Sequence, residues 1–167
     1  MIVVPCVSIY LSPFVATICS KDTPRADWIF SADRVIRLMI EFSLNFLPVK
    51  PKRVVTAVDD APLDGSEFAG KIVGVSVIRA GEAMETALRS CCRNVRIGKI
   101  LIQRDEHTAN PVFYMAKFPS DIHERHVLLL DPMLATGGSA LCAIGKLVDA
   151  GVDEDKRFSQ VSAAHIW

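Results

Sequence analysis

The first part of the chain shows a helical spacing of apolar residues that gives way to a strand pattern. Thr23 and Pro24 read as a helix cap and a first helical residue, and the helix they open is expected to end before Pro48. Residues 53–58 form a β-branched run, and the Asp-Gly pair at 64–65 is a turn signal. The apolar residues that recur at helical spacing are Trp28, Val35, Ile36, Met39, Phe42 and Phe46.

The second half of the chain alternates between apolar runs typical of strands and apolar spacing typical of helices. Apolar runs without alternation belong to strands that are buried on both faces. We therefore predict an α/β fold with a mostly parallel sheet flanked by helices. The predicted strands cover residues 72–78, 99–103, 127–130 and 157–163, and the predicted helices cover residues 82–92 and 139–150, before Gly151.

Residues 1–20 carry no charge and are largely apolar, which raises the question of a signal peptide or a membrane anchor. Pro5 and Pro13 interrupt this run, and no basic segment precedes it. We favour a strand at residues 2–4 followed by a buried irregular or helical segment. No repeat or linker divides the chain, so residues 1–167 are expected to form one compact domain.

Charge and cysteine content exclude several functional classes. Lys plus Arg and Asp plus Glu are equal at 19 each, so the chain has no net charge to attract nucleic acid or an anionic membrane. The five cysteines contain no C-x-x-C pair and are an odd number, which fits neither a zinc module nor a secreted disulfide framework. We therefore expect a cytoplasmic protein that binds neither nucleic acid nor membrane.

The strongest local signal lies where the predicted strand at 127–130 ends. Asp131 stands at the strand end, and Gly137 and Gly138 precede the next helix. Glycines let the backbone approach an anion, Thr136 and Ser139 add hydroxyl donors, and the helix N-terminus adds partial positive charge. The segment lacks the Gly-Lys-Ser/Thr of a Walker A loop and the spacing of a dinucleotide fingerprint. It suits a ribose 5-phosphate, although this local pattern alone leaves an ordinary strand-to-helix turn as an alternative.

Ligands of open α/β sheets bind at the carboxyl ends of the strands. This rule predicts one crevice formed by residues 79–81, 104–106, 131–139 and the residues after Ala164. An arginine at the end of a buried strand presents a fork of donors that grips phosphate oxygens. Arg79 and Arg104 are therefore candidate phosphate ligands, while a surface pairing of Arg79 with a nearby glutamate is the alternative.

Four ordered motifs resemble the uracil phosphoribosyltransferases, which are type I phosphoribosyltransferases. The segment LLLDPMLATGGS resembles their loop for phosphoribosyl pyrophosphate (PRPP), in which proline, here Pro132, replaces the second acidic residue of other type I enzymes. The other three motifs are SADRVIRL at residues 31–38, VSVIRAGEAME at 75–85 and RIGKILIQRDE at 96–106. The similarity covers about residues 20–164.

The resemblance implies transfer of ribosyl phosphate from PRPP to N1 of uracil, giving UMP and pyrophosphate, with Mg²⁺ bound through PRPP and no direct protein ligand to the metal. Asp131, Arg79 and Arg104 are the implied catalytic residues, and residues 104–111 correspond to a mobile flap. We also expect a homo-oligomer, with a GTP effector site left open. The implied PRPP-binding residues are Arg79, Arg104, Asp131, Pro132, Met133, Leu134, Ala135, Thr136, Gly137, Gly138 and Ser139.

The chain departs from the family pattern at its end. Members continue past the strand near residue 164 into a segment that contacts uracil, whereas this sequence stops at Trp167. We therefore expect the uracil-recognition segment to be missing and no uracil-binding residue to be present. The alternatives are a PRPP-binding module without transfer activity, resembling one half of some uridine kinase fusions, and an incomplete, inactive gene product.

Overall fold

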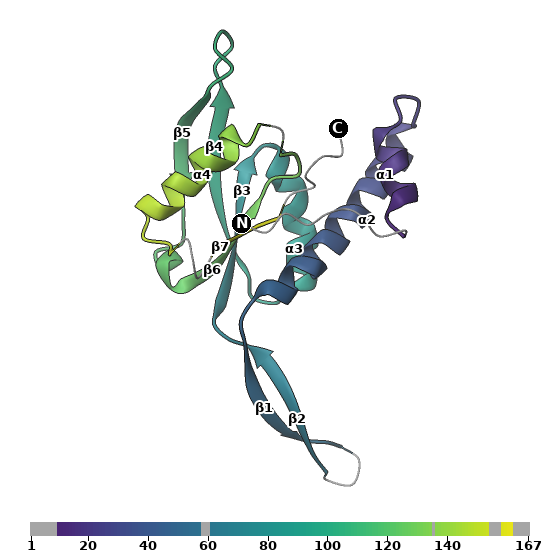
Figure 1. Cartoon of the computed structure of the whole chain (residues 1–167), viewed down its shortest axis with the longest axis vertical. Helices are drawn as coiled ribbons and strands as arrows, with labels where there is room; N and C mark the ends of the chain where they lie inside the picture. The colour runs from purple at the N-terminus through teal and green to yellow at the C-terminus, as the bar shows by residue number, and fades with distance from the viewer. Residues whose placement is uncertain (1–9, 58–60, 135, 154–157, 162–167) are drawn as a thin grey trace.

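A five-stranded sheet forms the centre of the molecule. The computed structural model describes residues 10–57, 61–134, 136–153 and 158–161 (Figure 1). The strand order is β5-β4-β3-β6-β7, and every neighbouring pair is parallel except β4 with β5. The mostly parallel α/β sheet predicted from the sequence is therefore confirmed. Its strands are β3 (Lys71–Ile78), β4 (Arg96–Arg104), β5 (Pro111–Lys117), β6 (Arg125–Leu130) and β7 (Phe158–Val161).

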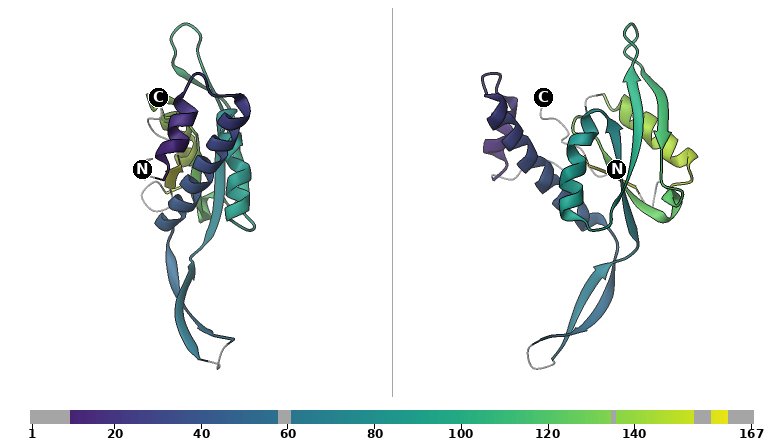
Figure 2. Two further views of the ribbon diagram at one scale, coloured as in Figure 1. Left: turned by 90° about the vertical axis from the view of Figure 1, so that its right-hand side faces the viewer. Right: turned by 180° about the vertical axis from the view of Figure 1, so that it is seen from behind.

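Helices cover both faces of this sheet, as Figure 2 shows. On one face α4 packs over an apolar cluster that includes Val75, Leu129 and Leu147. On the other face a second cluster, which includes Met39 and Leu88, joins the sheet to the remaining helices. The helices are α1 (Ser12–Cys19), α2 (Arg25–Ser43), α3 (Glu85–Cys91) and α4 (Gly138–Asp149), with 3₁₀ turns η1 (Leu44–Phe46), η2 (Ala80–Met84) and η3 (Ile122–Glu124).

The long helix predicted before Pro48 is confirmed as α2, but its first turn differs from the prediction. Pro24 occupies the cap position, and Thr23 makes no capping bond. The Thr23 hydroxyl instead donates to the Thr17 carbonyl at 2.7 Å, because α1 lies alongside α2. Of the apolar residues that recur at helical spacing, Val35, Ile36 and Met39 are buried, whereas Trp28, Phe42 and Phe46 are exposed.

An antiparallel hairpin of β1 (Val49–Val55) and β2 (Pro62–Phe68) projects from the sheet (Figure 1). The predicted strand at 53–58 therefore begins four residues earlier. The prediction of a turn at Asp64 and Gly65 is wrong, because both lie inside β2, opposite Arg53 and Lys52. Gly65 does not adopt a left-handed conformation, so the Asp-Gly signal gives way to cross-strand pairing.

The other predicted strands and helices lie within three residues of their observed bounds, with two further differences. The predicted helix at 82–92 is divided, since η2 precedes α3. The edge strand β5 was not predicted; it pairs with β4, so that only residues 105–110 join the two strands. Its run Val112, Phe113, Tyr114 has high β-propensity and could have revealed it.

Where a buried irregular or helical segment was expected within residues 1–20, the structure has the helix α1, but burial is limited to Ile18 among its residues. The strand predicted at residues 2–4 lies outside the described residues. Among the residues that the structure describes, no helix is both long and apolar enough to cross a membrane.

Candidate functional site

Three strand ends carry the predicted site residues. Because β3, β4 and β6 are parallel neighbours, their carboxyl ends lie at the same edge of the sheet. Arg79 follows β3, Arg104 is the last residue of β4, and Asp131 follows β6. The three residues that the sequence analysis selected for catalysis therefore lie at one edge of the sheet. The residues after Ala164 that were expected to complete this crevice lie outside the described part of the chain.

Asp131 is the buried acidic group of the site, with only 8% of its surface exposed. Its carboxylate accepts a hydrogen bond from the backbone N–H of Met133 at 3.3 Å. Burial raises the pKa of Asp131, while this hydrogen bond and the positive charge of Arg104 oppose the rise. A carboxylate held this way is a ready acceptor for ligand hydroxyl groups.

The loop after Asp131 turns into α4 through two glycines. Gly137 caps the helix with φ of 78°, a left-handed conformation that glycine adopts without strain. No side chain caps α4, so the first N–H groups of this helix have no capping partner from a side chain. A β-carbon at Gly138 would lie 3.5 Å from the Pro111 ring, which places the loop against the start of β5. This backbone can accept an anion.

The other predicted loop residues line this turn to different degrees. Thr136 and Met133 are exposed, whereas Pro132, Leu134 and Ser139 are half-buried. Ala135, which was also predicted to bind PRPP, lies outside the described residues.

Both arginines of the site are exposed and available to a ligand. Neither Arg79 nor Arg104 forms an ion pair within the described residues. The alternative in which Arg79 pairs with a neighbouring glutamate is wrong, because Glu82 and Glu85 both contact Lys99. The guanidinium of Arg79 therefore keeps its donors for an anion.

A polar cluster beneath Arg79 was missed by the sequence analysis. The Ser76 hydroxyl, fully buried in β3, donates to the Glu85 carboxylate at 2.6 Å. Lys99 of β4 lies opposite Ser76 and contacts the carboxylates of Glu82 and Glu85. The signal that could have found this cluster is a polar residue within the apolar run of each strand, Ser76 in β3 and Lys99 in β4.

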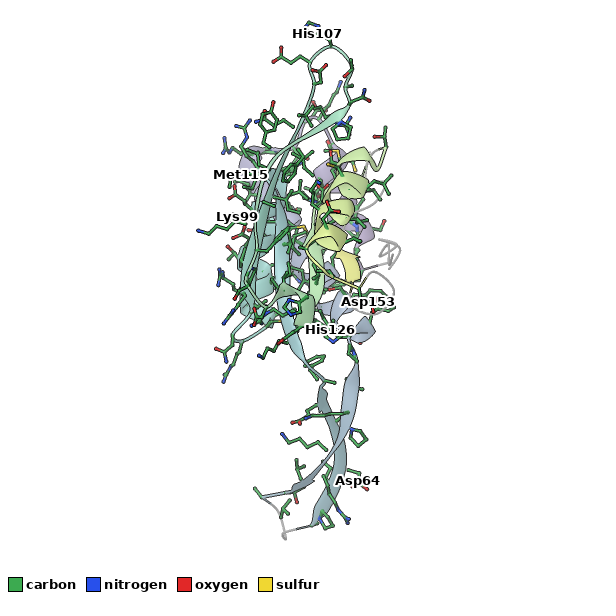
Figure 3. All side chains as sticks on the ribbon, turned by 90° about the vertical axis from the view of Figure 1, so that its left-hand side faces the viewer. Asp64, Lys99, His107, Met115, His126 and Asp153 are labelled. Atoms are coloured by element: carbon green, nitrogen blue, oxygen red, sulfur yellow. The ribbon has the colours of Figure 1, made fainter. Side chains whose placement is uncertain are left out.

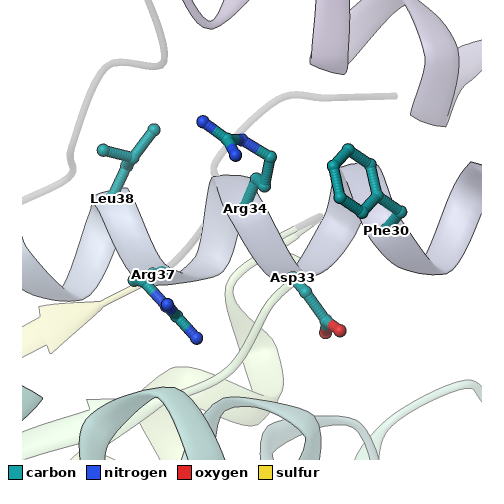
Figure 4. Close-up of a pocket in the computed structure, with 5 residues that line it drawn as sticks. All are labelled: Phe30, Asp33, Arg34, Arg37 and Leu38. Atoms are coloured by element: carbon teal, nitrogen blue, oxygen red, sulfur yellow. The ribbon is translucent and has the colours of Figure 1, made fainter. Parts of the chain in front are cut away.

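An apolar cavity of about 430 Å³ borders the site. Ala80 and Ala83 of η2 line one side, and Pro132 and Met133 of the loop line another. Trp28 and other residues of α2 complete the wall. A separate cavity of about 420 Å³ lies along α2, lined by Phe30, Asp33, Arg34, Arg37 and Leu38 (Figure 4).

Comparison with known proteins agrees with this arrangement. The sequence model of a family described as uracil phosphoribosyltransferase matches residues 8–163. Uracil phosphoribosyltransferase 1 of Schizosaccharomyces pombe is 56% identical over 136 residues, which cover 81% of this chain and 62% of the relative. A chloroplastic uridine/cytidine kinase of Arabidopsis thaliana is 52% identical over 134 residues, which cover 80% of this chain and 27% of the kinase.

Solved structures show the same fold at low sequence identity. A protein from Aquifex aeolicus superimposes with a TM-score of 0.79 and 22% identity, over 98% of this chain and 76% of that protein. A hypoxanthine-guanine phosphoribosyltransferase from Bacillus anthracis gives a TM-score of 0.54 and 10% identity, over 78% of this chain and 64% of that protein. These neighbours support the type I phosphoribosyltransferase fold.

The chain spans 62% of the length of its yeast relative, and that span contains the strand-end residues described above. The family match covers most of the chain, and 56% identity far exceeds what a shared fold alone requires. The chain therefore belongs to the uracil phosphoribosyltransferase family.

Proposed function

We propose that this protein acts as a uracil phosphoribosyltransferase, which converts uracil and PRPP to UMP and pyrophosphate. The observation that carries the proposal is the placement of buried Asp131 directly before a glycine turn and a helix N-terminus. A ligand with a diol and a phosphate matches this combination of an acceptor and backbone donors. The two exposed arginines at neighbouring strand ends supply the charge that a pyrophosphate requires.

In the proposed reaction, the bond between the anomeric carbon and pyrophosphate breaks as the bond to uracil N1 forms. Positive charge develops on the ribose and negative charge on the leaving pyrophosphate. Asp131 holds the ribose hydroxyls, and the loop through Gly137 and Gly138 holds the 5-phosphate. Arg79 and Arg104 stabilise the leaving group, so catalysis consists of positioning and charge stabilisation without a covalent nucleophile.

Magnesium fits this site as an ion that arrives with the substrate. Among the described residues, no three His, Cys, Asp or Glu side chains are grouped so as to hold a metal ion. Mg²⁺ is commonly held by one or two carboxylates together with substrate phosphates, and it retains several waters. In this proposal Asp131 holds the ribose hydroxyls, and an ion carried by PRPP would neutralise pyrophosphate charge without a direct protein ligand.

A second candidate is a PRPP-binding module that lacks transfer activity. The similarity to the Arabidopsis uridine/cytidine kinase favours it, because this chain corresponds to only 27% of that protein. The phosphate-binding residues are the same under both proposals. The two differ in whether bound PRPP reacts with uracil.

Titration calorimetry with Mg²⁺ and PRPP tests the shared part of the two proposals. We expect binding that Asp131→Ala and Thr136→Ala weaken, while the exposed hairpin variants Asp64→Ala and Ser66→Ala leave it unchanged. Absence of heat from the folded, unmutated protein would contradict the site assignment. Formation of UMP from uracil and PRPP then separates an enzyme from a binding module.

A further inference from the structure

Lys99 connects two carboxylates beside the turn that presents Arg79. Its ammonium nitrogen lies 2.5 Å from Glu82 Oε1 and 3.4 Å from Glu85 Oε1. Figure 3 shows Lys99 extending from the sheet on the side away from α4. The ammonium of a strand residue therefore holds two residues of the segment that follows β3.

The same segment is fixed from below by Ser76. Ser76 and Lys99 are opposite residues of the parallel strands β3 and β4. The buried Ser76 hydroxyl donates to the carboxylate oxygen of Glu85 that faces Lys99. Glu85 is thus seated on two neighbouring strands at the first turn of α3, and only 17% of its side chain is exposed.

Glu82 links this cluster to Arg79 through the backbone. The N–H of Glu82 donates to the Arg79 carbonyl at 3.2 Å and closes the 3₁₀ turn η2. The side chain of the same Glu82 contacts Lys99. Loss of the Lys99 contact would therefore act directly on Glu82, whose N–H closes the turn that begins at Arg79.

We propose that Lys99 is a positioning residue that fixes the turn presenting Arg79 to the pyrophosphate group of the substrate. The inference rests on the proposed function, because it assigns Arg79 to the leaving group. Lys99 itself contacts the turn and not the ligand. Loss of Lys99 should therefore reduce binding of ligands that reach Arg79 and spare those that do not.

The test compares binding of magnesium pyrophosphate and of ribose 5-phosphate by calorimetry. Lys99→Met should weaken pyrophosphate binding about two- to fivefold, the range expected for partly exposed ion pairs, and leave ribose 5-phosphate unchanged. Lys99→Arg should retain the binding of the unmutated protein, because a guanidinium can span both carboxylates. Lys71→Met, at the opposite end of β3, is the matched control and should bind both ligands normally.

The Arg79→Ala background shows whether Lys99 acts through Arg79. In that background, Lys99→Met should cause little further loss of pyrophosphate binding, since the group being positioned is absent. An equal loss in both backgrounds would overturn the inference. So would a folded Lys99→Met variant with unchanged pyrophosphate binding, or a loss that affects both ligands alike.

Glu82→Ala provides a second test if Lys99→Met does not fold. Removing a negative charge near an anion site would by itself strengthen pyrophosphate binding, whereas loss of the tether weakens it. We expect about a twofold loss, because Glu85 still contacts Lys99; a gain would overturn the inference. If the unmutated protein binds neither ligand, the proposed function fails together with the inference. If it binds both and these variants have no effect, only the inference fails.

Discussion

Gly81 packs against the main chain of Leu130, so closely that a β-carbon at residue 81 would overlap the Leu130 carbonyl oxygen. Gly81 belongs to η2, the turn that follows Arg79, and Leu130 is the last residue of β6, before Asp131. The contact joins two of the loops that form the proposed site. The absence of a side chain at residue 81 is therefore a condition for bringing Arg79 and Asp131 together.

Replacing Gly81 with alanine should destabilise the protein and displace η2. The overlap involves backbone atoms, which yield less readily than the end of a side chain, so we expect a cost of about 1–3 kcal/mol in the free energy of unfolding. Urea unfolding measures this cost. Gly145→Ala is the matched control, because no atom lies within 4 Å of the added carbon and α4 should gain about 0.5–1 kcal/mol. Equal stability of the two variants would contradict the packing argument.

The two arginines should distinguish ligands that carry pyrophosphate from ligands that do not. Arg79→Ala and Arg104→Ala should each lower the affinity for PRPP by about 1.5–3 kcal/mol where the contact is desolvated, since a hydrogen bond to a charged group is lost. Ribose 5-phosphate should bind with nearly unchanged affinity. Arg89→Ala, an exposed arginine of α3, is the control. Equal losses of affinity for PRPP and for ribose 5-phosphate would show that the arginines do not bind the leaving pyrophosphate.

We expect Asp131 to lower the stability of the folded protein at neutral pH although it contributes to PRPP binding. Its pKa is raised by burial, so the folded state favours the protonated form, and stability falls as the pH rises above the ordinary carboxyl range. Asp131→Asn removes this charge and should raise the melting temperature at neutral pH by on the order of 2 °C. The difference should disappear in acid, where both side chains are neutral. Calorimetric melting, with PRPP binding measured in parallel, checks both effects; a lower melting temperature of the Asn variant at neutral pH would contradict the assignment.

Asp121 should have the opposite dependence on pH. Its carboxylate accepts two hydrogen bonds from Arg125, at 2.7 and 3.0 Å, and the Arg125 guanidinium lowers the pKa of Asp121 to about 2. Stability from this group is complete above the unfolded value of 3.8 and is lost as the pH falls toward about 2.

Asp121→Asn should therefore be less stable than the unmutated protein at neutral pH, and the gap should narrow below pH 3.8. Urea unfolding at several pH values measures the gap. Asp149→Asn is the control, since Asp149 forms an exposed ion pair with Lys146 within α4. A gap that stays constant down to about pH 2 would show that the contribution of Asp121 does not depend on its charge.

The sheet was predictable from the sequence because its central strands are buried on both faces. The runs that became β3 and β6 contain few polar residues, and such runs rarely fit another structure. The hairpin and β5 are largely exposed, so burial does not determine which residues they contain. Within the hairpin, pairing across the strands overrides the local turn preference of Asp64 and Gly65.

The placement of Asp131 and Arg104 at strand ends was predictable from the sequence, because the apolar runs before them show where each strand stops. The Lys99 cluster was not predictable from the sequence. It depends on the register between β3 and β4 and on the turn that brings Glu85 close to Ser76. Register is a property of strand pairing, and a single strand does not encode it. The apolar cavity beside Met133 likewise requires α2, which lies about a hundred residues away in the sequence.

The projecting hairpin implies that the molecule does not open as one cooperative unit. All but one of the described side chains of β1 and β2 are exposed, and an isolated two-stranded ribbon is marginally stable in water. Amide hydrogens of the non-proline residues in Val49–Val55 and Pro62–Phe68 should therefore exchange with solvent through local opening at low free energy. Those of β3, buried between two apolar clusters, should exchange only when the whole sheet unfolds. A melting temperature therefore measures the unfolding of the five-stranded sheet and its helices, and it does not detect the opening of the β1–β2 hairpin.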